Sequence, residues 1–129
     1  MANVPEELRY TADHEWARRT SDPAILEIGI TEYAQGELGD IVFVNLPKPG
    51  EKFADHQAFG TIEAVKAVSD LYSPLAGEIV AVNPALDTDP AVVNRAPYTD
   101  GWMIRLKIAD PAQFDTLLAP AAYRSQIGA

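Results

Sequence analysis

Short runs of alternating hydrophobic and polar residues cover most of the chain, and Pro or Gly residues separate them. Alternation of this kind predicts β-strands that are buried on at least one face. The predicted strands cover residues 24–30, 40–46, 78–82 and 101–108. Turn-forming residues predict tight turns at 48–50 and 73–77. Strands with this spacing are typical of a small barrel or sandwich.

Helices are predicted where this alternation stops. Thr31 is a good N-cap and Gly39 a good C-terminal residue, so we expect a short helix between them. Asp110 and Pro111 favour a second helical start, and a further short helix is predicted over residues 120–127. The C-terminal helices therefore cover about 110–127.

Composition describes an ordinary folded chain with a strong acidic bias. The 129 residues are 47% hydrophobic and 22% charged, which predicts a single domain over 1–129 with one core. The net charge of −9 argues against a nucleic-acid partner. The acidity either serves solubility or favours basic protein surfaces as partners.

Two absences from the sequence limit its chemistry further. The chain has no cysteine, so any thiol chemistry must come from a cofactor. No stretch reaches the roughly 20 apolar residues that span a bilayer, and residues 1–10 lack the apolar core of a signal peptide. We therefore expect no membrane partner and a cytoplasmic location.

The two histidines are candidates for catalysis or metal binding. His14 lies between Asp13 and Glu15, but adjacent residues on a strand point to opposite faces, so we expect these three not to converge. The sequence has neither a G-x-S-x-G nucleophile motif nor His spacing typical of a metal site. No catalytic residue and no metal site are predicted, and Trp16 and Trp102 are interpreted as core aromatics.

Residues 60–74, with the sequence GTIEAVKAVSDLYSP, can be interpreted in two ways. Hydrophobic residues recur at helical spacing at Ile62, Val65 and Val68, which favours a surface helix with Lys66 as a solvated charge. The segment also resembles the lipoylation hairpin of glycine cleavage H proteins. The matching residues are Glu63, Val65, Lys66, Ala67, Ser69, Asp70 and Pro74. Ala64 replaces the usual Ser of that pattern.

The resemblance extends over nearly the whole chain. Further matches lie at Tyr10, 14–16, 29–31, 33–35, 38–44, 97–98 and 101–102. The approach to the Pro-Tyr pair, Asn94-Arg95-Ala96, is less typical of the family. The resemblance implies an all-β, lipoyl-domain-like barrel-sandwich hybrid with short flanking helices and a lipoyl hairpin at about 60–74.

The resemblance also implies a cofactor and its contacts. Lipoate is expected to be attached covalently to Lys66, and the small residues Ala64 and Ala67 leave room for a modifying enzyme. Glu15 and Asp70 are expected to contact the loaded arm, because carboxylates form charge-assisted hydrogen bonds to an amine. A biotin carrier presents its lysine between two methionines, and Val65 and Ala67 contradict that alternative.

The function implied by the resemblance is that of a non-catalytic carrier in the glycine cleavage system. Such a carrier shuttles the aminomethyl group from glycine decarboxylase (P protein) to aminomethyltransferase (T protein). Dihydrolipoamide dehydrogenase (L protein) and a lipoyl-attaching enzyme are the other implied partners. One alternative stays open: a lipoyl relay or regulatory H-like protein that donates lipoate from the same lysine to other complexes.

Overall fold

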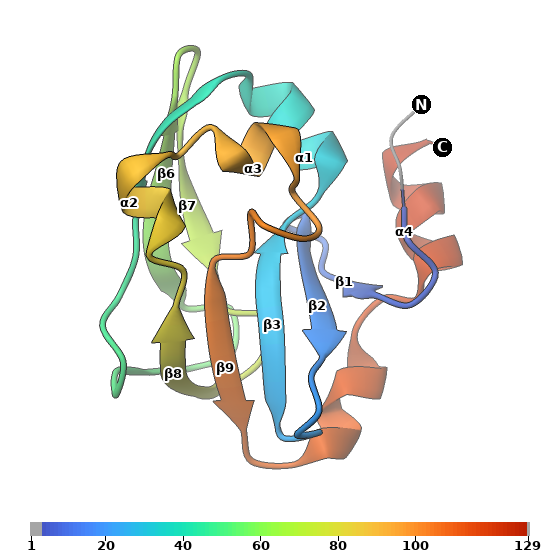
Figure 1. The fold of residues 1–129 in the computed structure, drawn as a ribbon. Coiled ribbons are helices and arrows are strands. Elements are labelled where there is room, and N and C mark those ends of the chain that lie inside the picture. Colours follow the sequence, from blue (N-terminus) through green and yellow to red (C-terminus); the bar gives the residue numbers. More distant parts are fainter. Residues whose placement is uncertain (1–3, 129) are drawn as a thin grey trace.

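Two antiparallel sheets form the body of the protein in a computed structural model that describes residues 4–128. The strands are β1 (Arg9–Tyr10), β2 (Glu15–Arg19), β3 (Ile25–Ile30), β4 (Ile41–Asn45), β5 (Lys52–Phe53), β6 (Ala58–Ala64), β7 (Val68–Tyr72), β8 (Gly77–Val82) and β9 (Ile104–Ile108). The larger sheet has the order β1-β2-β3-β9-β8-β5 and the smaller one the order β4-β6-β7 (Figure 1).

Five short helical segments flank the sheets. They are α1 (Glu32–Leu38), α2 (Ala85–Thr88), α3 (Val92–Arg95), the 3-10 helix η1 (Pro111–Thr116) and α4 (Pro120–Ile127). The predicted all-β barrel-sandwich with short flanking helices is confirmed. Among residues 4–128, none of the helices is both long enough and apolar enough to cross a lipid bilayer.

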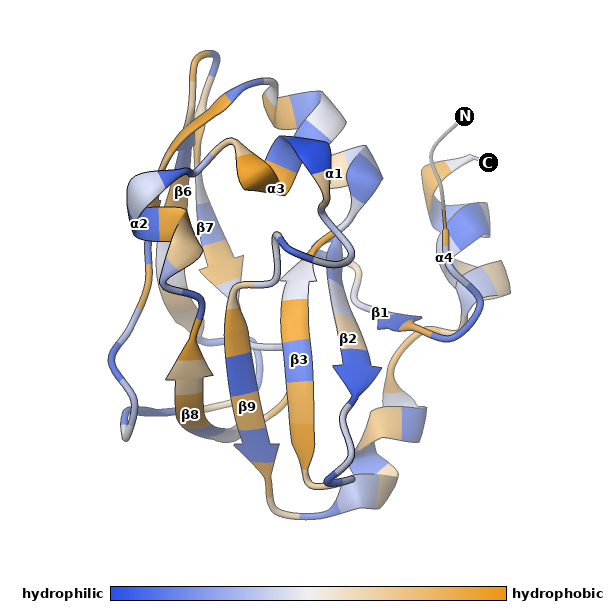
Figure 2. Cartoon of the chain, viewed as in Figure 1, coloured by the Kyte–Doolittle hydropathy of each residue, from blue (hydrophilic) through white to orange (hydrophobic). Residues whose placement is uncertain are grey.

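The core lies between the two sheets and follows from strand alternation. Leu26 and Ile28 of β3 are fully buried, whereas Glu27 between them is on the outer face, and this alternation is visible along β3 and β9 in Figure 2. The same buried cluster contains Val44 of β4 and Ile62 of β6. Hydrophobic side chains from both sheets therefore form one packed interior.

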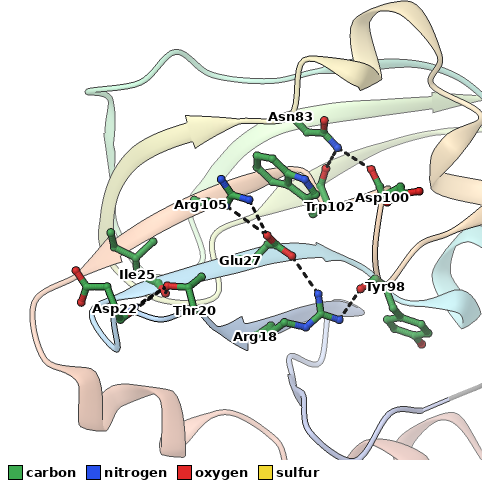
Figure 3. A network of polar contacts seen from close by, with 10 residues as sticks. All are labelled: Arg18, Thr20, Asp22, Ile25, Glu27, Asn83, Tyr98, Asp100, Trp102 and Arg105. Carbon is green, nitrogen blue, oxygen red and sulfur yellow. Dashed lines mark hydrogen bonds and ion pairs between the residues drawn. The ribbon is translucent and has the colours of Figure 1, made fainter.

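A charge network crosses the outer face of the larger sheet (Figure 3). Glu27 is in register with Arg18 on one side and Arg105 on the other, and its carboxylate accepts hydrogen bonds from both guanidinium groups, at 3.0 and 3.2 Å. Arg105 also stacks over the ring of Trp102, at 4.2 Å from the ring centroid. Trp102 is only partly buried, which differs from the predicted core position, whereas Trp16 is completely buried as predicted.

A second, aromatic cluster joins α4 to the larger sheet. Tyr10 and Tyr123 stack with ring centroids 4.6 Å apart, and both are fully buried with Trp16. Trp16 packs directly over Gly29, where a Cβ atom would lie 2.7 Å from the indole ring. Glycine is therefore required at position 29 by close approach rather than by backbone conformation.

Local sequence signals located α1 and α4 correctly but were wrong in detail elsewhere. The Thr31 side chain accepts a hydrogen bond from Ala34 N, as expected of an N-cap. The segment after Asp110 forms a 3-10 helix, and α2 and α3 were not predicted. The strand predicted over 101–108 begins only at Ile104, because Gly101 N and Trp102 N donate to turn carbonyls instead of a neighbouring strand.

Strict alternation fails in β4. A bulge between Ile41 and Phe43 shifts the register, so Val42 and Phe43 are both about half exposed while Ile41 and Val44 are buried. A β-bulge inserts one extra residue into one strand and disrupts the regular pairing at that point. The result places two exposed hydrophobic side chains on the smaller sheet, in the strand that neighbours β6.

Candidate functional site

Lys66 lies at the tip of a β-hairpin formed by β6 and β7. Glu63 is in register with Val68, Ala64 N donates to the carbonyl of Ala67 at 2.8 Å, and Lys66 between them is exposed. The helix favoured by local spacing is thus wrong and the hairpin is confirmed. β6 is the central strand of its sheet, and the long-range pairing with β4 overrides the local helical pattern.

The hairpin tip is tied to the segment that follows α1. Val65 N donates to the carbonyl of Asp40 at 3.0 Å. Asn94 of α3 holds the same segment, because its side-chain oxygen accepts from Ile41 N at 2.9 Å and its amide donates to the carbonyl of Gly39 at 3.0 Å. The tip and the ends of α1 and α3 therefore lie at one end of the molecule (Figure 1).

A cavity of about 270 Å³ lies between α1 and the hairpin. Its lining residues are Asp13, His14, Glu15, Ile30, Tyr33, Ala34, Glu37, Leu38, Ile62, Ser69, Asp70 and Leu71. The structure thus brings the two predicted carboxyl groups, Glu15 and Asp70, to one cavity. Lys66 itself lies outside this lining, on the exposed tip.

Glu15 is the buried acid of the cavity. Its side chain is 2% exposed, accepts a hydrogen bond from the Thr11 hydroxyl at 2.7 Å and accepts a long one from Tyr72 N at 3.4 Å. Burial disfavours the charged form and raises the pKa of Glu15 to about 8, against the opposing effect of the Thr11 hydrogen bond. A carboxyl group that is mainly neutral at pH 7 therefore lines the cavity.

Asp70 differs from Glu15 in its surroundings. It is exposed on β7, at an edge of the smaller sheet, in register with Thr61. The cavity lining therefore combines a buried carboxyl group with a solvated one. Ile30, Ile62 and Leu71 supply apolar surface to the same cavity.

The prediction that the residues around His14 do not converge is wrong. His14 has a positive φ of 69° and belongs to a turn, so Asp13, His14 and Glu15 all line the same cavity instead of diverging along a strand. Its Nδ1 lies 2.9 Å from the Tyr123 hydroxyl, and burial lowers its pKa. His56 is exposed and lies beside Asp13 and Asp55, outside the cavity lining.

Two residues that support the site were not identified from the sequence. Tyr123 bonds both His14 and the N-cap residue Thr31, and Asn94 holds Gly39 and Ile41. The sequence places each of them more than 50 residues from these partners, so no local pattern indicated the contacts. The unusual residues before the Pro-Tyr pair were the only signal at Asn94.

Comparisons with known proteins agree over nearly the whole chain. The family model of the glycine cleavage H-protein matches residues 8–128. Glycine cleavage system H proteins of Chlorobaculum parvum and Opitutus terrae are 53% and 51% identical, over 98% and 99% of this chain and 98% and 100% of theirs. A crystal structure of the H protein from Mycobacterium marinum superposes with a TM-score of 0.88 at 37% identity, covering 98% of this chain and 100% of that one. The chain therefore belongs to the glycine cleavage H-protein family.

Proposed function

We propose that the protein is the lipoyl-bearing carrier of the glycine cleavage system and that Lys66 is its attachment site. The observation that carries this proposal is an exposed lysine at the tip of a hairpin, beside a cavity that contains a buried carboxyl. Family membership supports the carrier role. A lipoyl relay would use the same lysine but gains no separate support from the described residues.

The residues around Lys66 fit a lipoyl group. The Lys66 side chain is exposed. Its neighbours in the turn, Val65 and Ala67, are uncharged and have shorter side chains than lysine. Acylation converts the flexible cationic side chain into a neutral amide. When bound, the lipoyl group supplies two sulfur atoms that cycle between a disulfide and a dithiol, and one of them accepts and releases the aminomethyl group.

The chain's own residues bind and protect what the arm carries. An aminomethyl group ends in an amine, which is cationic near neutral pH, and Glu15 and Asp70 can accept charge-assisted hydrogen bonds from it. The cation favours the ionised form of Glu15, so binding releases the proton that burial holds there at neutral pH. Apolar residues such as Leu71 exclude water from the bound group.

The protein brings one arm to several enzymes and catalyses none of the steps. The proposed partners are glycine decarboxylase, aminomethyltransferase, dihydrolipoamide dehydrogenase and the lipoyl-attaching enzyme. A tethered arm raises the effective concentration of the carried group at each active site. The net charge of −9 favours basic docking surfaces on these partners, so their affinity should fall as salt screens the charges.

Mass spectrometry after exposure to a lipoyl-attaching enzyme tests the site. We expect one lipoyl group, mapped to the Lys66 peptide, and none on the control lysines Lys48, Lys52 and Lys107. The Lys66→Arg variant should stay unmodified and should not support glycine-dependent release of carbon dioxide by added decarboxylase. A lipoyl group on Lys66→Arg, or activity of the purified wild type without the decarboxylase, would contradict the proposal.

A further inference from the structure

The side chain of Lys66 lies across Gly39. A Cβ atom at Gly39 would lie 2.8 Å from Cε and 3.7 Å from Nζ of Lys66, so the lysine stem occupies the space that any other residue would fill. Gly39 ends α1 with a φ of 84° and donates its N–H to the carbonyl of Gln35. The exposed lysine therefore has a defined surface beneath it, at the C-terminal end of a helix.

Hydrogen bonds fix this surface on both sides. The Asn94 side chain accepts from Ile41 N at 2.9 Å and donates to the Gly39 carbonyl at 3.0 Å, so it spans the residue between them. The same amide donates to Oε1 of Gln35 in α1 at 2.8 Å. On the hairpin side, Val65 N donates to the Asp40 carbonyl at 3.0 Å. The backbone under Lys66 is thus held from α1, α3 and the hairpin.

The stem crosses Gly39 next to the cavity that contains Glu15 and Asp70. Leu38, which directly precedes Gly39, lines that cavity together with Glu37. A side chain that runs from the hairpin tip over Gly39 therefore passes the C-terminal end of α1, whose residues Glu37 and Leu38 line the cavity. A methyl group at position 39 would take the place of Cε and turn the stem away from this path.

We propose that Gly39, held by Asn94, is a positioning residue that guides the arm on Lys66 from the hairpin tip into the cavity. The proposal rests on the proposed function, in which Lys66 carries the arm. The reason for glycine is the room that it leaves for the lysine stem, in addition to the positive φ that favours glycine at a helix end. Gly39 touches no reacting atom and acts through Lys66 alone.

Gly50 provides a matched control for the backbone effect. Its φ of 95° resembles that of Gly39, but no atom lies within 4 Å of the position that its Cβ would take. Gly39→Ala and Gly50→Ala both place a side chain at a positive φ, and only the first obstructs Lys66. A second test variant, Asn94→Asp, keeps the acceptor for Ile41 N but loses the donor to Gly39 and Gln35.

Nuclear Overhauser contacts in the unmodified protein test the geometry directly. We expect a cross-peak between the α protons of Gly39 and the ε protons of Lys66 in the wild type and in Gly50→Ala, and a weaker one in Asn94→Asp. Absence of this cross-peak in the wild type would overturn the proposal. This measurement does not depend on lipoylation, so it tests the path of the lysine stem over Gly39 separately from the identity of the attachment site.

Alkylation of the reduced arm by N-ethylmaleimide tests the consequence. In the lipoylated proteins, followed by intact mass, we expect several-fold faster alkylation in Gly39→Ala and a smaller increase in Asn94→Asp, with Gly50→Ala equal to the wild type. Equal rates in Gly39→Ala and the wild type, or equal increases in both glycine variants, would overturn the proposal. A wild type that gains no lipoyl mass would instead refute the proposed function.

Discussion

The hydroxyl of Tyr123 lies 2.7 Å from Oγ1 of Thr31, which joins the C-terminal helix to the N-cap of α1. The same hydroxyl lies 2.9 Å from Nδ1 of His14, on the wall of the cavity. One buried phenol therefore links α4, α1 and the turn before β2. The cavity depends on this link, because α1 and that turn supply most of its lining on the side away from the hairpin.

Removal of this hydroxyl should destabilise the fold while leaving the aromatic stack with Tyr10 in place. For Tyr123→Phe we expect a loss of about 1–3 kcal/mol in the free energy of unfolding, because Thr31 and His14 lose a buried partner. Tyr33→Phe is the control, since the Tyr33 hydroxyl bonds the side chain of Glu37, which is exposed. Urea unfolding curves of equal midpoint for both variants would contradict this assignment.

Alanine should have opposite effects at two glycines. Gly29→Ala places a methyl group 2.7 Å from the buried Trp16 ring and should destabilise the protein by about 1–3 kcal/mol. Gly36→Ala meets open space inside α1 and should stabilise the protein by up to about 1 kcal/mol, because alanine favours helix. Chemical denaturation followed by tryptophan fluorescence checks both values. Two shifts of the same sign would contradict the packing argument.

The stability of the protein should depend on pH through Glu15. Its pKa is about 8 when folded and near 4.5 when unfolded, so between these values the folded state holds a proton that the unfolded state has lost. The contribution of Glu15 to the free energy of unfolding is therefore largest below pH 4.5. It decreases by a few kcal/mol as the pH rises from there through about 8.

Glu15→Gln removes this dependence. Its unfolding free energy, measured in urea at pH 5, 6, 7 and 8, should fall less with pH than that of the wild type. The lowered pKa of His14 gives the opposite slope below pH 6.5, but His14 is present in both proteins and its effect cancels in the difference. Parallel stability profiles for the two proteins would show that Glu15 is ionised when folded throughout this range.

Glu15 and Asp70 together should prolong the lifetime of the aminomethylated arm. In Glu15→Gln/Asp70→Asn we expect lipoylation at Lys66 to proceed normally, because neither residue lies on the hairpin tip. The loaded form should decay faster without the folate-dependent enzyme, since the amine loses both carboxyl acceptors. Mass spectrometry of the loaded species measures this decay. Identical decay rates in the variant and the wild type would remove both carboxyl groups from the protective role.

Strands β3, β4 and β8 and the capped helix α1 were predictable because their signals are local, whereas β1, β2 and β5 were not predicted. The residues 31–39 carry both ends of α1 in their own sequence, and β3 alternates as a half-buried strand should. Helices α2 and α3 are four residues long and cannot display a helical period. The bulge at Val42 likewise arises from pairing with β6, which the sequence of β4 alone does not contain.

The site was predictable only where the family motif covers it. Resemblance alone indicated Lys66, Glu15 and Asp70 as candidate residues, whereas local spacing at 60–74 favoured a helix. The convergence of Asp13, His14 and Glu15 was missed because a positive φ at His14 turns the chain, and neither flanking residue signals that turn. Contacts of Tyr123 and Asn94 link residues far apart in the sequence, so they appear only once the fold is known.

The link from Tyr123 to Thr31 also determines when the site can be completed during biosynthesis. Hairpin contacts such as Glu63 with Val68 join near neighbours, so the hairpin can pair soon after it leaves the ribosome. The wall of the cavity must wait for Tyr123, which is synthesised 92 residues after Thr31. In a nascent chain the hairpin contacts can therefore form before this wall of the cavity is complete, so the two parts of the candidate site arise at successive stages of synthesis.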